Sequence, residues 1–169
     1  WLRLLARHLS SALQRDEYSL RQPSRRLLLE DIVVPGLIPG TRGRVVLAID
    51  TSGSMSATQL DAIAGQLGAL DSMIDELHVV VADATVHEVV RPGALAAFLR
   101  RREVRGGGGT DHRPVFEWLA GSGIEADVFV GVTDLWTKLP DAPPRCPVVW
   151  LVPPRHGSAA FGEVIEMGQ

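Results

Sequence analysis

The chain has 169 residues, of which 46% are apolar and 22% are charged, as expected for one globular domain with a sizeable core. The formal net charge of −3 gives no reason to expect nucleic acid or an anionic membrane as a partner, and no apolar run reaches the roughly 18 residues of a membrane span. The single cysteine excludes an intramolecular disulfide and favours a cytoplasmic location.

The N-terminal part of the chain is expected to precede the main domain. Leucines recur at roughly helical spacing over residues 1–14, which predicts a short amphipathic helix. Residues 15–43 are rich in Arg, Ser and Pro, which favours an irregular connector, with RRLLLE at 25–30 as a helical turn or an edge strand. Because the chain opens on Trp1 rather than Met, we interpret this part as the tail of an upstream region, followed by one domain over 44–169.

From residue 44 the pattern alternates between short apolar strands and amphipathic helices. We expect strands over 45–49, 77–82, 86–90, 126–132, 148–152 and 162–167. Helices are expected over 59–74, 94–101 and 113–120. The second and third strands are too close in sequence for a helix between them, so they should pair antiparallel. The predicted fold is α/β, a doubly wound and mostly parallel sheet with helices on both faces and one antiparallel edge strand.

The segment DTSGSM directly follows the first buried strand, VVLAI. Its residues Asp50, Ser52 and Ser54 alternate, which places one carboxylate and two hydroxyl oxygens on one short loop. Mg²⁺ prefers about six oxygen ligands and is usually held by one or two carboxylates together with neutral oxygens and water. The loop therefore suits a hard divalent cation, although a Ser/Gly-rich turn that caps the next helix would use the same residue types.

Two later segments also end on oxygen-bearing side chains. GGGGTD, residues 106–111, joins a flexible glycine run to Thr110 and Asp111, and a hinge loop with a helix cap is the alternative interpretation. VFVGVTDLW, residues 128–136, ends a buried strand on Asp134, which could also be an ordinary turn residue. In doubly wound sheets, ligands bind outside the carboxyl ends of the strands, so we expect these loops to converge there.

The motifs DTSGSM, GGGGTD and VTD, in this order, resemble the metal-ion-dependent adhesion site of von Willebrand factor type A (VWA) domains over roughly residues 44–168. The resemblance implies a Rossmann-like VWA fold that binds Mg²⁺, with Mn²⁺ or Ca²⁺ as alternatives. It assigns the metal site to the following five residues: Asp50, Ser52, Ser54, Thr110 and Asp134. It also implies that a carboxylate from a partner protein completes the coordination shell.

A narrower resemblance rests on SLRQPSRR, GGGGTDHRPVFEWL, TDLW and FGEVIEM, which are similar to the C-terminal VWA-like domain of a bacterial family of proposed metallopeptidases. This resemblance implies a bacterial cytoplasmic setting, an upstream peptidase-like half and a MoxR-type AAA+ ATPase as a partner. One residue departs from the pattern. Leu135 stands where the family usually has Gly after the third-loop Asp, which leaves the shape of that loop open.

No catalytic residue is expected in this chain. The nearest match to the zinc signature HExxH is HEVVR at 87–91, which ends in Arg and lies in a strand pattern. Ser52 and Ser54 lack the flanking glycines of a nucleophile elbow. We therefore predict a metal-dependent protein-binding module. The alternatives are a regulatory or substrate-docking domain of a hydrolase whose active site lies upstream and, more remotely, a Mg²⁺-dependent phosphoesterase.

Four further features of the sequence give weaker evidence about function. His112 is expected to be an early helix residue that faces solvent, with an approach to the metal loop as the alternative. Trp136 is either an exposed contact residue or part of the core. Cys146 is interpreted as a small buried apolar residue rather than a nucleophile. A basic run is interpreted as a solvated helix end, or else as a patch that steers an acidic partner, and comprises Arg100, Arg101, Arg102 and Arg105.

Overall fold

The computed structural model describes residues 1–13, 17–23, 35–38, 43–50, 57–81, 86–101 and 111–167. Three of the predicted metal ligands lie outside these ranges, namely Ser52, Ser54 and Thr110. The segments 25–30 and 106–109 also lie outside them.

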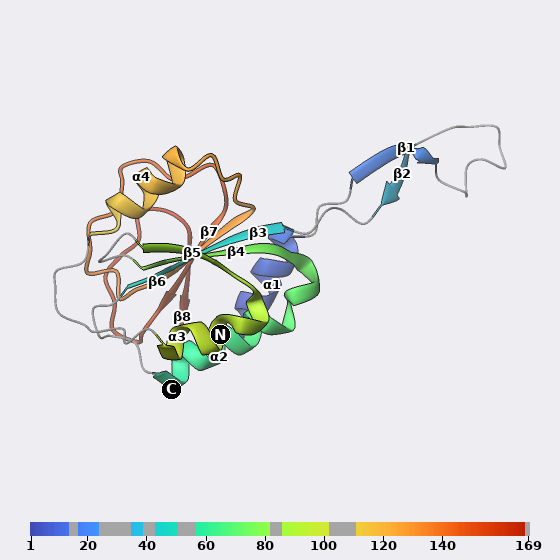
Figure 1. The fold of residues 1–169 in the computed structure, drawn as a ribbon. Helices are drawn as coiled ribbons and strands as arrows, with labels where there is room; N and C mark the ends of the chain where they lie inside the picture. Colours follow the sequence, from blue (N-terminus) through green and yellow to red (C-terminus); the bar gives the residue numbers. More distant parts are fainter. Residues whose placement is uncertain are drawn as a thin grey trace.

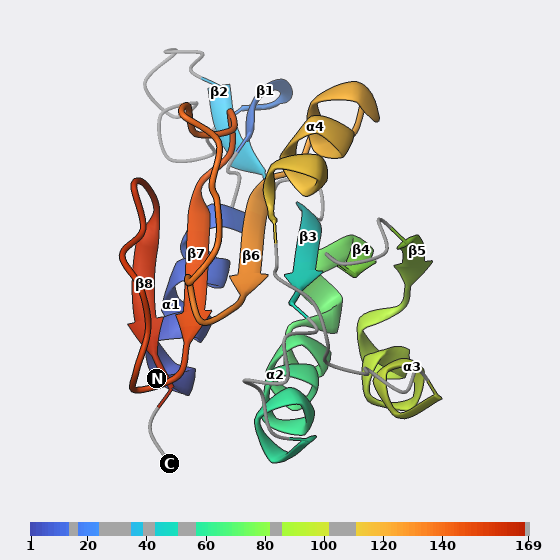
Figure 2. The same ribbon diagram turned by 90° about the vertical axis from the view of Figure 1, so that its left-hand side faces the viewer.

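Six strands form the main sheet in the order β5-β4-β3-β6-β7-β8 (Figure 1). Their bounds are β3 Gly43–Ile49, β4 Ile74–Val81, β5 Val86–Val90, β6 Val128–Val132, β7 Val148–Val152 and β8 Glu163–Glu166. Every neighbouring pair is parallel except β4 and β5, which are antiparallel. Figure 2 shows β8, β7, β6 and β3 side by side with their arrowheads pointing the same way. The predicted α/β fold, mostly parallel with one antiparallel edge strand, is confirmed.

Helices cover both faces of this sheet, as predicted. Three lie on one side, which we call the three-helix face: α1 (Leu2–Leu13), α2 (Ala57–Ala69) and α3 (Leu95–Arg101). The fourth, α4 (Arg113–Gly121), lies on the opposite side, the α4 face (Figure 1). Short 3₁₀ turns precede β4 and α3, at η2 (Asp71–Met73) and η3 (Pro92–Ala94). The helix predicted over 59–74 is shorter than expected, because its last residues form η2 and Ile74 already belongs to β4. None of the helices that the structure describes has the length and apolarity that a membrane crossing requires.

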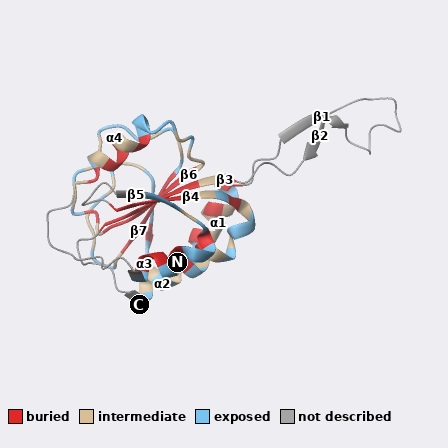
Figure 3. Cartoon of the chain, in the orientation of Figure 1, coloured by how far each residue is buried: buried red, intermediate tan, exposed pale blue. Residues whose placement is uncertain are grey.

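The central strands are buried on both faces, which explains why they read as continuous apolar runs. Along β3, Val45, Leu47 and Ile49 pack on the three-helix face, while Val46 and Ala48 pack on the α4 face. Figure 3 shows the same buried character along the strands in the middle of the sheet. The core is therefore two aliphatic layers that share one sheet.

The N-terminal helix belongs to the same core. Leu5, Leu9 and Leu13 recur every fourth residue along α1 and pack in the cluster of the three-helix face, as the amphipathic pattern predicts. His8 Nε2 also lies 3.0 Å from Glu163 Oε1 on β8. The domain boundary expected at residue 44 stays a prediction, although α1 packs directly on the domain that follows it.

Two short strands precede the main sheet. β1 (Glu17–Pro23) and β2 (Pro35–Ile38) pair antiparallel in a separate two-stranded ribbon, which projects away from the six-stranded sheet in Figure 1. This differs from the irregular connector expected here. Pro23 and Pro35 pair with each other at one end of the ribbon, where the missing backbone N–H groups cost least, so their presence does not prevent pairing.

The strand order reverses at β3. The chain leaves β3 through α2 to β4 on one side and returns through α4 to β6 on the other side. The carboxyl ends of β3 and β6 therefore adjoin at the topological switch point, where doubly wound sheets bind their ligands. Asp50 follows β3, and Asp134 follows β6 after one intervening residue.

The packing of Trp150 leaves room only for glycine at the neighbouring position 131. Trp150 on β7 is fully buried, and its Nε1 donates to the carbonyl oxygen of Phe161 over 2.8 Å. Its register partner on β6 is Gly131. A Cβ at position 131 would lie 2.3 Å from Trp150 Cζ3, so no larger residue fits without displacing the indole.

We therefore expect Gly131→Ala to lower the free energy of unfolding by about 1–3 kcal/mol through overpacking against Trp150. Gly65→Ala on α2 is the control, because nothing lies within 4 Å of a Cβ at that position. This control should raise stability by about 0.5–1 kcal/mol through helix propensity. Chemical denaturation of both variants measures the difference, and equal stabilities would contradict the packing argument.

Candidate functional site

The carboxylate of Asp50 lies buried at the switch point, with 1% of the residue exposed. Its Oδ2 accepts a hydrogen bond of 2.9 Å from Thr133 Oγ1, and its backbone N–H donates to the carbonyl oxygen of Val132 over 2.9 Å. Thr133 is also fully buried, and its Oγ1 accepts from the backbone N–H of Leu135. A buried carboxylate is costly unless it is hydrogen-bonded or bound to a cation, and Thr133 supplies one hydrogen bond at this position.

Asp134 is half-buried beside this network. Its Oδ1 accepts a 3.0 Å hydrogen bond from the backbone N–H of Trp136, which makes a tight Asx turn. Its carbonyl oxygen accepts a 2.8 Å hydrogen bond from the backbone N–H of Gly157. Within the described part of the chain, the second carboxylate oxygen of Asp134 receives no hydrogen bond.

The backbone of Leu135 shows the shape of the loop after β6, which the sequence left open. Its φ of 59° lies in the left-handed region that Gly adopts easily, so the loop takes a glycine-like conformation without a glycine. The Leu135 side chain is 4% exposed and packs on the α4 face, which offsets the backbone strain. Gly157 passes so close that a Cβ there would lie 2.3 Å from the carbonyl oxygen of Leu135.

His112 is fully buried, so the expectation that it faces solvent is wrong. Its backbone N–H donates to the carbonyl oxygen of Lys138, its Nδ1 lies 3.2 Å from Thr137 Oγ1, and its ring meets Trp150 edge to face. The sequence carried a signal for this burial, because His112 precedes the buried residues Val115, Phe116 and Leu119 of α4 by three, four and seven positions.

Three carboxylates influence the pKa of His112. Burial lowers the pKa of the imidazole, while the negative charges of Asp50, Asp111 and Asp134 oppose this effect. These three carboxylates follow β3, precede α4 and follow β6. The imidazole Nε2 is buried and has no hydrogen-bond partner among the described residues.

Asp111 is engaged with Arg113 at the start of α4. Arg113 Nε donates to Oδ1 over 2.9 Å and to Oδ2 over 3.1 Å, and Arg113 Nη2 also donates to Oδ2. The hydrogen bonds from Arg113 lower the pKa of Asp111 from 3.8 to about 2, with a smaller contribution from the charge of Lys138. Asp111 therefore stays ionised with its charge directed at Arg113.

The five predicted metal ligands divide into two groups. Asp50 and Asp134 lie at the adjoining ends of β3 and β6, as predicted, whereas the three hydroxyl residues fall outside the described ranges. Among the described residues, no three His, Cys, Asp or Glu side chains are grouped closely enough to hold a metal ion. The predicted set contains only two carboxylates, and its other three ligands are hydroxyl residues outside the described ranges. The metal site therefore stays a prediction.

Sequence reasoning missed Thr133, which positions Asp50, and Gly157, which supports the loop after Asp134. Thr133 had a visible signal, because it is a hydroxyl residue at the end of an otherwise apolar strand. Gly157 had none, because it reaches the loop only through the tertiary fold.

The structure also tests the predictions for the basic run, Cys146 and the zinc-signature match. Arg100 is exposed, and its Nε donates to the carbonyl oxygen of Ala96 and lies 3.7 Å from Asp61 Oδ1, in keeping with a solvated helix end. Arg102 and Arg105 lie outside the described residues. Cys146 is half-buried rather than fully buried, and burial raises the pKa of its thiol, which keeps it protonated at neutral pH. The HEVV part of the zinc-signature match lies in strand β5 rather than on a helix.

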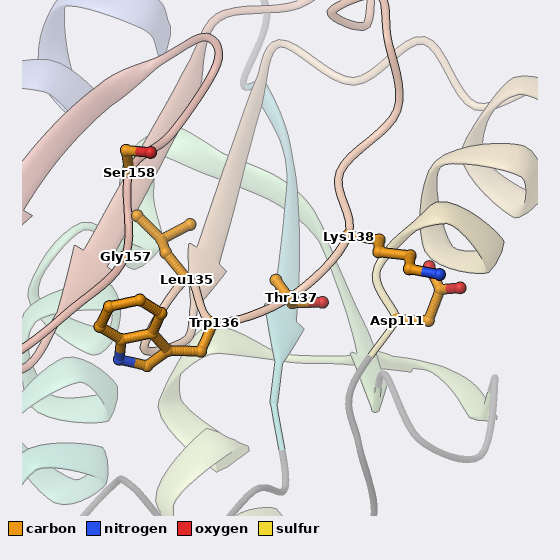
Figure 4. A pocket seen from close by; sticks show the side chains of 7 residues that line it. All are labelled: Asp111, Leu135, Trp136, Thr137, Lys138, Gly157 and Ser158. Carbon is orange, nitrogen blue, oxygen red and sulfur yellow. The ribbon is translucent and has the colours of Figure 1, made fainter.

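A groove of about 610 Å³ adjoins the switch point (Figure 4). It is lined by loop residues 135–138 together with Asp111, Gly157 and Ser158, and we call it the Trp136 groove. Trp136 is 71% exposed, which decides between the two interpretations in favour of an exposed residue.

The fold and the position of the site place this chain among Rossmann-like α/β domains of the VWA type. Residues 45–168 match the VWA-like domain (DUF2201) family, so the chain belongs to that family. The comparison with curated proteins gave no match. The VWA-like part of the resemblance is thereby confirmed.

The left-handed backbone of Leu135 predicts an unusual order of stabilities. Leu135→Ala and Leu135→Gly both remove the buried side chain, at a cost of about 2–5 kcal/mol. Gly relieves the backbone strain that Ala retains, so Leu135→Gly should be about 1 kcal/mol more stable than Leu135→Ala. The control pair is Leu119→Ala and Leu119→Gly in α4, where Ala should be the more stable residue. Chemical denaturation of the four variants gives the order, and a more stable Leu135→Ala would contradict the loop conformation.

The Asp111–Arg113 contact predicts a pH-dependent contribution to stability. Because the pKa of Asp111 is lower in the folded chain, the contact stabilises the fold above pH 3.8, and this contribution is lost as the pH falls from 3.8 to about 2. Carboxyl ¹³C NMR should show Asp111 titrating near pH 2, and Arg113→Gln should return it toward 3.8. Arg91→Gln, which removes an exposed arginine elsewhere, should leave the midpoint unchanged. A midpoint near 3.8 in the wild-type chain would contradict this assignment.

Proposed function

We propose that this domain is a metal-ion-dependent protein-binding module, in which a divalent cation at the switch point captures an acidic group of a partner protein. One observation carries the proposal. Asp50 and Asp134 follow two neighbouring parallel strands, β3 and β6, and Thr133 donates a hydrogen bond to Asp50. The chain at Asp111 and His112 also lies beside the loop after β6, because Asp111 forms a β-bridge with Lys138 and the His112 N–H donates to the Lys138 carbonyl oxygen.

The donor set fits a hard cation. Asp50 is a buried carboxylate whose Oδ2 accepts from Thr133, and a bound divalent cation would be stabilised by its negative charge. Asp134 is oriented by Trp136 through one carboxylate oxygen, and the described residues donate no hydrogen bond to the other oxygen. Ser52, Ser54 and Thr110 would supply the neutral oxygens, which is the mixture that Mg²⁺ uses in proteins.

The composition of this set determines what else can bind. When bound by two carboxylates and neutral hydroxyls, Mg²⁺ keeps positions filled by exchangeable water, and a carboxylate of another protein can replace that water. The protein residues contribute orientation, because the Asp50 and Asp134 carboxylates are each fixed by a hydrogen bond. The resemblance to the bacterial metallopeptidase-like family makes a cytoplasmic MoxR-type AAA+ ATPase the first partner to test, with the chain as the C-terminal part of a longer protein.

The proposal predicts that Asp50→Asn abolishes Mg²⁺ binding measured by isothermal titration calorimetry. Asn keeps an oxygen that accepts from Thr133, so circular dichroism should show that the fold is retained. Asp75→Asn, at an exposed position in β4, is the matched control and should bind like the wild-type chain. Mg²⁺ affinity that is unchanged in Asp50→Asn would overturn the metal site.

Capture of a partner needs a second measurement. A purified MoxR-type ATPase from the same cells should be retained by the immobilised wild-type chain in Mg²⁺ and released by a chelator. The Asp50→Asn chain should retain none. Retention that persists in the chelator would exclude capture through the cation for this partner.

A further inference from the structure

The Trp136 groove presents an aromatic side chain beside the proposed cation site. Trp136 follows Asp134 by two positions, yet it is 71% exposed, whereas the intervening Leu135 is 4% exposed. In Figure 4 the indole lies at one end of the groove, with Leu135, Gly157 and Ser158 beside it. Exposing a Trp has no benefit for folding, and Trp is the residue most enriched at binding hot spots.

The backbone that presents Trp136 is held at several points. The N–H of Trp136 donates to Asp134 Oδ1, and the Gly157 N–H donates to the carbonyl oxygen of Asp134. Further along, the carbonyl oxygen of Lys138 accepts from the N–H of His112. A contact residue on a backbone that is already ordered loses little conformational entropy when a partner binds, so its contact area converts more fully into affinity.

The other end of the groove is lined by Lys138 and Asp111. Figure 4 shows the Lys138 side chain beside Asp111, opposite Trp136 along the groove. Arg113, which does not itself line the groove, donates to both oxygens of Asp111, so Lys138, Asp111 and Arg113 together carry one net positive charge. This charge favours an acidic occupant over a basic one and is complementary to a partner that already supplies a carboxylate.

We propose that the Trp136 groove selects the partner, and that its occupant is an acidic protein segment with a large apolar side chain next to the carboxylate that reaches the cation. The apolar side chain packs against the Trp136 indole, and Lys138 favours further acidic residues in the same segment. This inference rests on the proposed function, since the cation holds the first carboxylate. It adds a specificity that coordination by a cation alone does not supply, because any exposed Asp or Glu could coordinate a cation.

The test selects binders from a display library of random linear heptapeptides on the whole chain in Mg²⁺. Selected peptides should combine Asp or Glu with an adjacent Phe, Tyr, Trp, Leu or Met. Synthetic versions of these peptides should bind Trp136→Ala at least tenfold more weakly than the wild-type chain. Trp136→Phe, which keeps an aromatic ring, should recover most of the affinity. Lys138→Gln should weaken the peptides that carry a second acidic residue.

Val89→Ala is the matched control, because Val89 is 60% exposed on β5 and does not line the groove, so this variant should bind the peptides like the wild-type chain. Peptides that carry an acidic residue without an apolar neighbour, and that bind Trp136→Ala at wild-type affinity, would overturn the groove proposal and leave the proposed function standing. Peptides that bind equally in EDTA and to Asp50→Asn would overturn both. The same result follows if selection yields no peptide that depends on Mg²⁺.

Discussion

The hydrogen bond between Thr133 Oγ1 and Asp50 Oδ2 is the interaction on which the site depends. It joins residues 83 positions apart, both buried, at the ends of two parallel strands that adjoin because the strand order reverses between them. A hydrogen-bond donor fixed beside the carboxylate lowers the cost of burying it. The same hydroxyl accepts from the N–H of Leu135, so the position of the Asp50 carboxylate is tied to that of the loop after β6.

In the loop after β6, two consecutive side chains point in opposite directions. Leu135 turns into the core and Trp136 turns out to solvent. A left-handed backbone at Leu135 allows this reversal, and hydrogen bonds to Asp134 on both sides of the turn maintain it. The stability of the α4 face and the exposure of the contact residue therefore depend on the same short segment.

His112 connects this loop to α4. Its backbone and side chain contact Lys138 and Thr137, and its ring packs against Trp150, which in turn requires Gly131 beneath it. The groove and the switch point thus rest on the α4-face core rather than on independent loops. A change in this core is expected to reach the site through His112, because the intervening contacts are close-packed.

The sequence by itself determined the six strands of the main sheet, its antiparallel edge and the positions of Asp50 and Asp134, because burial on both faces requires continuous apolar runs and short turns allow only antiparallel neighbours. It also held the spacing that aligns His112, directly before α4, with the buried residues of that helix. Only the tertiary structure decided the left-handed turn at Leu135, the support from Gly157 and the exposure of Trp136. These features arise where segments distant in sequence meet, and periodicity describes only neighbours along one element.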